Sequence, residues 1–168
     1  GLGDVYKRQV LAHALGVIRR DIFHQPCDVN ALATAALYHD ASEILTGDLP
    51  TPIKYHNAEI MSAYHAVEDL AVQKLLGMLP PELRETYADV LAEDKDGDIY
   101  PLVKAADKLS AYIKCIEERK AGNNEFLSAE AQTRAALEAS PLPEVQYFLE
   151  HFIPAFERDL DELGAIGQ

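Results

Sequence analysis

Residues 37–43 read Leu-Tyr-His-Asp-Ala-Ser-Glu and place three ionisable side chains, His39, Asp40 and Glu43, late in an otherwise apolar run. The run predicts a helix that is apolar nearly all round, and such a helix is usually buried. Charged groups in a buried helix are costly unless they pair, lose their charge or bind a metal. At helical spacing Glu43 lies near both His39 and Asp40. These three side chains are therefore the first candidates for chemistry.

A second mostly apolar stretch, residues 100–118, carries Asp107 in its middle. An imidazole and two carboxylates from two buried helices would form a mixed nitrogen and oxygen set, which suits Mn²⁺, Fe²⁺, Co²⁺, Ni²⁺ or Zn²⁺. This makes His39, Asp40 and Asp107 candidate ligands of a divalent metal. The alternative is a hydrogen-bonded core histidine with both aspartates paired to nearby lysines, and composition alone leaves both interpretations open.

The composition favours a small globular domain that acts on small molecules. The chain has 168 residues, 48% hydrophobic content and a net charge of −13. This charge argues against a nucleic-acid polymer as partner, whereas a cation could still bridge a small phosphorylated substrate to the carboxylates. No apolar run has membrane-spanning length, and no secretory signal pattern is present. Cys27 and Cys115 have no metal-ligand spacing, so we expect unpaired thiols and a cytoplasmic location.

The elements that must position these side chains are all predicted to be helices, because no alternating strand pattern occurs. Asp28 is the expected N-cap of the helix that carries His39, and Gly47 its expected stop. The acidic loop at 93–98 lacks the length and the terminal Glu of an EF-hand, so a calcium loop is disfavoured. The expected helices span about residues 10–20, 28–45, 57–78, 82–91, 100–118, 125–139 and 142–163, and the inward face of the third is expected to carry Ile60, Tyr64, Val67, Leu70, Ala71 and Leu75.

The first nine residues fit poorly with the rest of the chain. They contain no initiator Met and no helix cap, and an apolar helical pattern begins abruptly at Val10. We expect residues 1–9 to be a foreign or artefactual leader, and residues 10–168 to be a single, N-terminally truncated helical domain.

Three sequence blocks resemble a known family. Residues 39–55, 102–107 and 121–127, in that order, closely resemble the bacterial 5′-deoxynucleotidases among the HD-domain metal-dependent phosphohydrolases. The resemblance extends from about Val10 almost to the C-terminus. It implies an all-α HD-domain bundle of about six or seven helices, one divalent metal such as Mn²⁺ or Co²⁺, and a homodimer. The implied reaction is hydrolysis of 2′-deoxyribonucleoside 5′-monophosphates to nucleoside and phosphate.

The same resemblance implies roles for individual side chains in the metal site. His39, Asp40 and Asp107 match three of the four metal ligands of the family, and Glu43 matches the acid thought to position or activate the attacking water. The alternative for Glu43 is an exposed helix-face acid that forms a salt bridge with a neighbour.

Two further acids match substrate-binding positions of the family. Asp48, in the Gly-Asp-Leu-Pro-Thr-Pro loop, matches a residue near the sugar that helps to favour 2′-deoxyribose, and Glu93 matches a further acidic pocket residue. For Asp48 the alternative is a turn residue that caps its own backbone. The loop around Glu93 differs in length from that of the family.

The sequence departs from the family at its start. The family's first metal-binding histidine lies in a Glu-His-Ser segment, which the register places at or near Asp4, and an Arg-Trp pair that contacts substrate would precede Gly1. We therefore expect the fold to persist with reduced activity. His13 is expected to be a packing or surface histidine, and so are the scattered His24, His56, His65 and His151.

Three functions remain open from the sequence. The first is the metal-dependent deoxynucleotidase. The second is another HD-type phosphohydrolase of small phosphoesters, against which only the loop that contains Asp48 argues. The third is a helical domain with an impaired site that binds a nucleotide without turnover.

Overall fold

A computed structural model describes residues 2–47 and 57–158, with side chains from residue 6 onward, and these residues form helices without a strand. The all-α prediction is confirmed, and seven of the described α-helices have nine or more residues: α1 Leu2–Val17, α2 Val29–Tyr38, α5 Ala58–Met78, α6 Pro81–Leu91, α7 Tyr100–Lys120, α8 Leu127–Glu138 and α9 Pro143–His151. The shorter elements are the π-helix η1 Ile18–Ile22, α3 Glu43–Thr46, the 3₁₀-helix η2 Asn124–Phe126 and α10 Ile153–Glu157.

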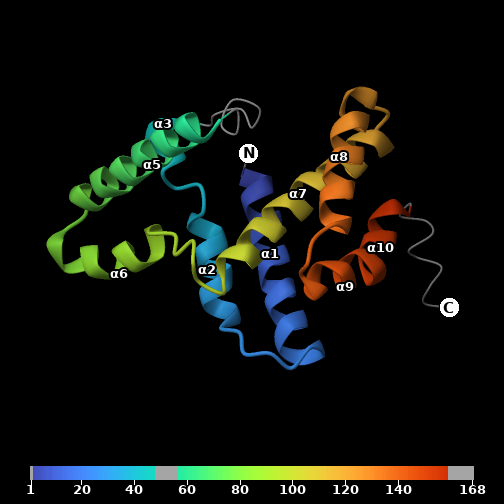
Figure 1. Cartoon of the computed structure of the whole chain (residues 1–168), viewed down its shortest axis with the longest axis horizontal. Coiled ribbons are helices and arrows are strands. Elements are labelled where there is room, and N and C mark those ends of the chain that lie inside the picture. Colours follow the sequence, from blue (N-terminus) through green and yellow to red (C-terminus); the bar gives the residue numbers. More distant parts are fainter. Residues whose placement is uncertain (1, 48–56, 159–168) are drawn as a thin grey trace.

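The core lies where α1, α2 and α7 pack together (Figure 1). Helix α7 is the central element and buries side chains along most of its length, including Leu102, Leu109 and Ile116, which are fully buried. Gly16 lets α1 approach α2 closely, because a Cβ atom there would lie 2.9 Å from Cδ2 of Leu32. The same packing places Arg8, in the first half of α1, beside the end of α2 and the middle of α7.

Helices α5 and α6 lie at one side of the molecule, away from α8, α9 and α10 (Figure 1). The predicted helix at 57–78 is confirmed, and the side chain of Asn57 caps it by accepting from Ile60 N–H at 2.8 Å. The prediction that Val67 and Leu70 face inward is wrong, because they are 49% and 56% exposed. Helix α5 contacts α3 and α6 rather than the core, so much of its apolar surface stays uncovered. Within the described residues, no helix combines the length and the apolar character needed to cross a membrane.

The helix that carries the candidate site is shorter than expected. Asp28 caps its start as predicted, but α2 ends at Tyr38, and Ala41 N–H then bonds to Tyr38 C=O at 2.9 Å in a tighter i→i+3 turn. The carbonyl of Ala36, which would accept from residue 40 in a continuing α-helix, accepts instead from Nε of Arg8 at 3.1 Å. The predicted unbroken helix at 28–45 is therefore wrong, and a contact from α1 accounts for the change.

Two other boundaries differ from the prediction. Helix α1 begins at Leu2 rather than Val10, so it continues through the expected junction between leader and domain. The expected helix at 142–163 is broken at Phe152, between α9 and α10. Pro154 comes directly after that break, and a proline has no N–H to donate within a continuing helix.

Candidate active site

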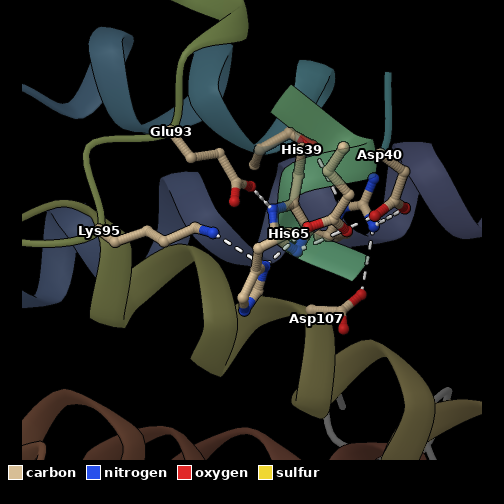
Figure 2. A network of polar contacts seen from close by, with 9 residues as sticks. His39, Asp40, His65, Glu93, Lys95 and Asp107 are labelled. Atoms are coloured by element: carbon tan, nitrogen blue, oxygen red, sulfur yellow. Dashed lines mark hydrogen bonds and ion pairs between the residues drawn. The ribbon is translucent and has the colours of Figure 1, made fainter. Parts of the chain in front are cut away.

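Three elements bring a cation and two carboxylates together. Arg8 comes from α1, Asp40 comes just after α2, and Asp107 lies in the middle of α7. The Arg8 side chain is only 6% exposed, and its Nη1 donates to Oδ2 of Asp40 and, at 3.2 Å, to Oδ1 of Asp107. Figure 2 shows Asp40 and Asp107 on opposite sides of this contact. One nitrogen thus joins two carboxylates that are far apart in the sequence.

The surroundings keep Arg8 charged. Burial by itself would lower the pKa of the guanidinium, but the hydrogen bonds and charges of Asp40 and Asp107 outweigh it and raise the pKa above its ordinary value. Nη2 of Arg8 is buried and has no hydrogen-bond partner among the described residues. The two carboxylates, rather than a complete set of hydrogen bonds, therefore hold this cation in place.

His39 directly follows α2 and has two different neighbours. Its Nδ1–H donates to Oε1 of Glu93, which lies in the loop between α6 and α7, and its Nε2 is 3.9 Å from Oδ1 of Asp40 (Figure 2). In a neutral imidazole this arrangement leaves the lone pair on Nε2. Metal-binding histidines are commonly oriented by a carboxylate in this way. The structure thus places Glu93 at the candidate site through its contact with His39.

Asp40 and Asp107 pair with the Arg8 guanidinium, and His39 lies beside Asp40, but the three side chains do not form a ligand group. Across residues 2–47 and 57–158, no three His, Cys, Asp or Glu side chains lie close enough to hold a metal ion. The donor set itself suits a divalent transition metal, and the guanidinium is a stand-in cation between the two carboxylates. The side chains of His39, Asp40 and Asp107 therefore suit a bound cation, and in this structure the Arg8 guanidinium lies between the two aspartates. The side chain of Asp4 lies outside the described part.

An open cavity of about 480 Å³ adjoins these residues, which is within the size range of small-ligand pockets. Glu43, the first residue of α3, lines it together with His39, Asp40, Glu93 and Asp107, and α5 contributes the facing side chains. The structure therefore brings five of the six sequence-predicted site residues to one cavity. The sixth, Asp48, lies outside the described residues.

Three basic groups also line the cavity. Nζ of Lys95 is 3.0 Å from Nδ1 of His65, which is itself 2.9 Å from Oε2 of Glu68, whereas Lys104 has no partner among the described residues (Figure 2 shows the first two). His65, which the sequence predicts to be a surface or packing histidine, thus lines the cavity with a partly exposed side chain. The only signal in the sequence for a basic group at this cavity is the i,i+3 spacing of Lys104 and Asp107, which places both side chains on one face of α7.

The sequence matches the 5′-deoxynucleotidase YfbR-like family over residues 5–156. It is 49% identical over 156 residues to a protein of Shigella flexneri named 5′-deoxynucleotidase YfbR, covering 92% of this chain and 78% of that protein, and 48% identical over the same length to its Escherichia coli namesake. In structure it is similar to an HD-domain phosphohydrolase from Listeria innocua, with a TM-score of 0.79, 26% identity, and coverage of 94% of this chain and 76% of that one.

Proposed function

Because this chain belongs to the 5′-deoxynucleotidase YfbR-like family, we propose that it hydrolyses 2′-deoxyribonucleoside 5′-monophosphates to the deoxyribonucleoside and phosphate. The observation that carries the proposal is the convergence of His39, Asp40, Glu43 and Asp107 on one cavity that can hold a small ligand. These groups provide the donors for a cation and a carboxylate for a water molecule, which are the two requirements of phosphate monoester hydrolysis.

In the proposed site His39, Asp40 and Asp107 would hold one divalent ion such as Mn²⁺ or Co²⁺. Such an ion, when bound, polarises a phosphate oxygen and lowers the pKa of the attacking water. Glu93 keeps the proton on Nδ1 of His39, so that Nε2 presents its lone pair. Glu93 is thus a positioning residue, which acts through the imidazole.

Glu43 orients the attacking water or takes its proton, and it begins a helical turn at the cavity wall. For the sugar, we propose that Asp48 and its proline-flanked loop exclude a 2′-hydroxyl by shape. Discrimination of this kind is worth only about 1–3 kcal/mol, so the preference for deoxyribose is a ratio of rates and not an absolute one.

Lys104 is proposed to contact the substrate phosphate. It lines a cavity rich in carboxylates and has no partner among the described residues. Since a hydrogen bond to a charged group contributes about 1.5–3 kcal/mol, Lys104→Ala should lower kcat/KM for dAMP by about 10- to 100-fold, mostly through KM. Steady-state phosphate release measures this effect. Lys104→Arg should restore part of it, and Lys108→Ala, an exposed lysine one turn further along α7, should change it little. Equal effects of the two alanine variants would contradict a phosphate contact.

The proposed activity is tested by phosphate release from dAMP, AMP and an aryl phosphate, each with and without Mn²⁺ or Co²⁺. We expect metal-dependent release that is fastest with dAMP. Equal rates with dAMP and AMP would favour another HD-type phosphohydrolase. No release from any substrate by a chain with a helical circular-dichroism spectrum would reject the activity.

One observation favours a second candidate, a nucleotide-binding domain with an impaired site. Arg8 already neutralises Asp40 and Asp107, so a metal would have to displace it. Binding of dAMP without hydrolysis, measured by calorimetry at high Mn²⁺ concentration, would support this candidate.

We also propose that the chain is a cytoplasmic homodimer whose domain comprises residues 10–168. The exposed apolar side chains of Val67, Leu70 and Met78 on α5 offer a surface that a second copy could cover. Cys27 and Cys115 are free thiols, as is usual in a reducing compartment.

A further inference from the structure

We infer that Arg8 is an internal cation that competes with a divalent metal for Asp40 and Asp107. The inference deepens the proposed function and rests on it for the presence of a metal at this site. It concerns the occupancy of the two carboxylates and not the hydrolysis itself. Its consequence is that the affinity of this chain for metal depends on a residue of α1 that is not itself a ligand.

The geometry supports direct competition. A single nitrogen, Nη1 of Arg8, donates to one carboxylate oxygen of Asp40 and one of Asp107, which come from different elements. A metal ion that takes Asp40 and Asp107 as ligands would compete with Nη1 of Arg8 for the same carboxylate groups. The guanidinium is permanently charged and too large to share them, so one cation must leave before the other binds.

The other contacts of Arg8 show what holds it there. Its Nε donates to the carbonyl of Ala36, and its side chain is almost completely buried, so the group is held in a fixed position. However, Nη2 is buried without a described partner, which makes this conformation poorer in hydrogen bonds than a guanidinium usually is. Displacement by a metal would therefore break the contacts to Asp40, Asp107 and Ala36 and expose the unsatisfied Nη2 group to water.

The removal of Arg8 should leave two neighbouring carboxylates without a counterion. Like charges at such a site repel each other, and a divalent cation relieves that repulsion more effectively than solvent does. We therefore expect metal to bind more tightly, and to stabilise the fold more, when Arg8 is replaced by a neutral residue.

The experiment is a Mn²⁺ titration of the purified chain by electron paramagnetic resonance, in which free Mn²⁺ gives the signal. Arg8→Ala and Arg8→Gln should each bind Mn²⁺ at least about tenfold more tightly than the parent chain, because a competing charge is gone. Glutamine retains a donor for the Ala36 carbonyl and so keeps the measurement possible if the alanine variant does not fold. Lys7→Ala is the matched control, because Lys7 precedes Arg8 on α1 but pairs with Glu117 at 2.5 Å. It should leave the Mn²⁺ affinity unchanged.

A second readout is thermal unfolding with and without Mn²⁺. The ion should raise Tm more in the Arg8 variants than in the parent chain and the Lys7 control. Equal Mn²⁺ affinity in the parent and in a folded Arg8 variant would overturn the inference, and so would the absence of Mn²⁺ binding in all of them. Because neither readout involves phosphate release, tighter binding without any hydrolysis would reject the proposed function and uphold the competition.

Discussion

Glu43→Gln is expected to lower kcat for dAMP hydrolysis by about 10²- to 10⁴-fold at saturating Mn²⁺, the usual contribution of a positioned general base. Glutamine has the size of glutamate but cannot take a proton at neutral pH. Glu43 lines the cavity beside His39 and Asp40 but is not among the proposed ligands. The apparent affinity for Mn²⁺ should therefore fall much less than kcat does. Stopped and continuous phosphate assays measure kcat, and Mn²⁺ titration gives the affinity.

Glu85→Gln is the matched control for Glu43→Gln. Glu85 is an exposed acid on α6 outside the cavity lining, so its substitution makes the same change in charge without touching the site. A loss of kcat below about threefold in Glu43→Gln would rule out the general-base role and leave Glu43 as a surface acid. A large loss of Mn²⁺ affinity would instead make it a ligand.

Local signals in the sequence are sufficient to predict most of the helices. Asp28 and Asn57 cap the starts of α2 and α5, and Pro81 and Pro143 lie in the first turns of α6 and α9, where a missing N–H has no cost. The period of apolar residues then defines each helix along its length. The all-α class is therefore predictable from signals that operate within a few residues.

The predictions that failed depend on contacts between distant segments. A 3.6-residue period shows that α5 has an apolar face, but it does not show that Val67 and Leu70 remain uncovered. Similarly, α2 ends early because Arg8, far away in sequence, takes the Ala36 carbonyl. The period of the sequence carries no information about either contact.

The residue types of the candidate site are predictable from the sequence, but their partners are not. Acids that the sequence predicts to be buried in apolar helices point to Asp40 and Asp107, because a buried charge needs a counter-charge. In the structure both side chains are in fact partly exposed, at 39% and 48%. The identity of the cation that supplies this counter-charge depends on the tertiary structure. In this structure the cation is Arg8, which belongs to the stretch that the sequence predicts to be a leader. The division at residue 9 stays a prediction, although α1 runs through it.

Removal of the His39 imidazole should weaken Mn²⁺ binding by more than about 100-fold, whereas loss of its positioning partner in Glu93→Gln should weaken it by about 10- to 100-fold. The reason is the geometry of the ring, because Glu93 accepts from Nδ1–H and so leaves the Nε2 lone pair toward Asp40. Glutamine can still accept a hydrogen bond but without the negative charge that makes the imidazole a stronger ligand. Mn²⁺ titration of His39→Ala and Glu93→Gln measures both effects.

The double variant distinguishes positioning from direct binding. If Glu93 acts only through His39, then Glu93→Gln should cause no further loss of Mn²⁺ affinity in a His39→Ala background, so that the two effects are strongly non-additive. Additive losses would instead indicate that Glu93 contacts the metal or the substrate directly. The family resemblance implies such a role, because Glu93 matches an acidic pocket residue. An unchanged Mn²⁺ affinity in His39→Ala would show that the imidazole is not a metal ligand, and it would reject the proposed metal site in this cavity.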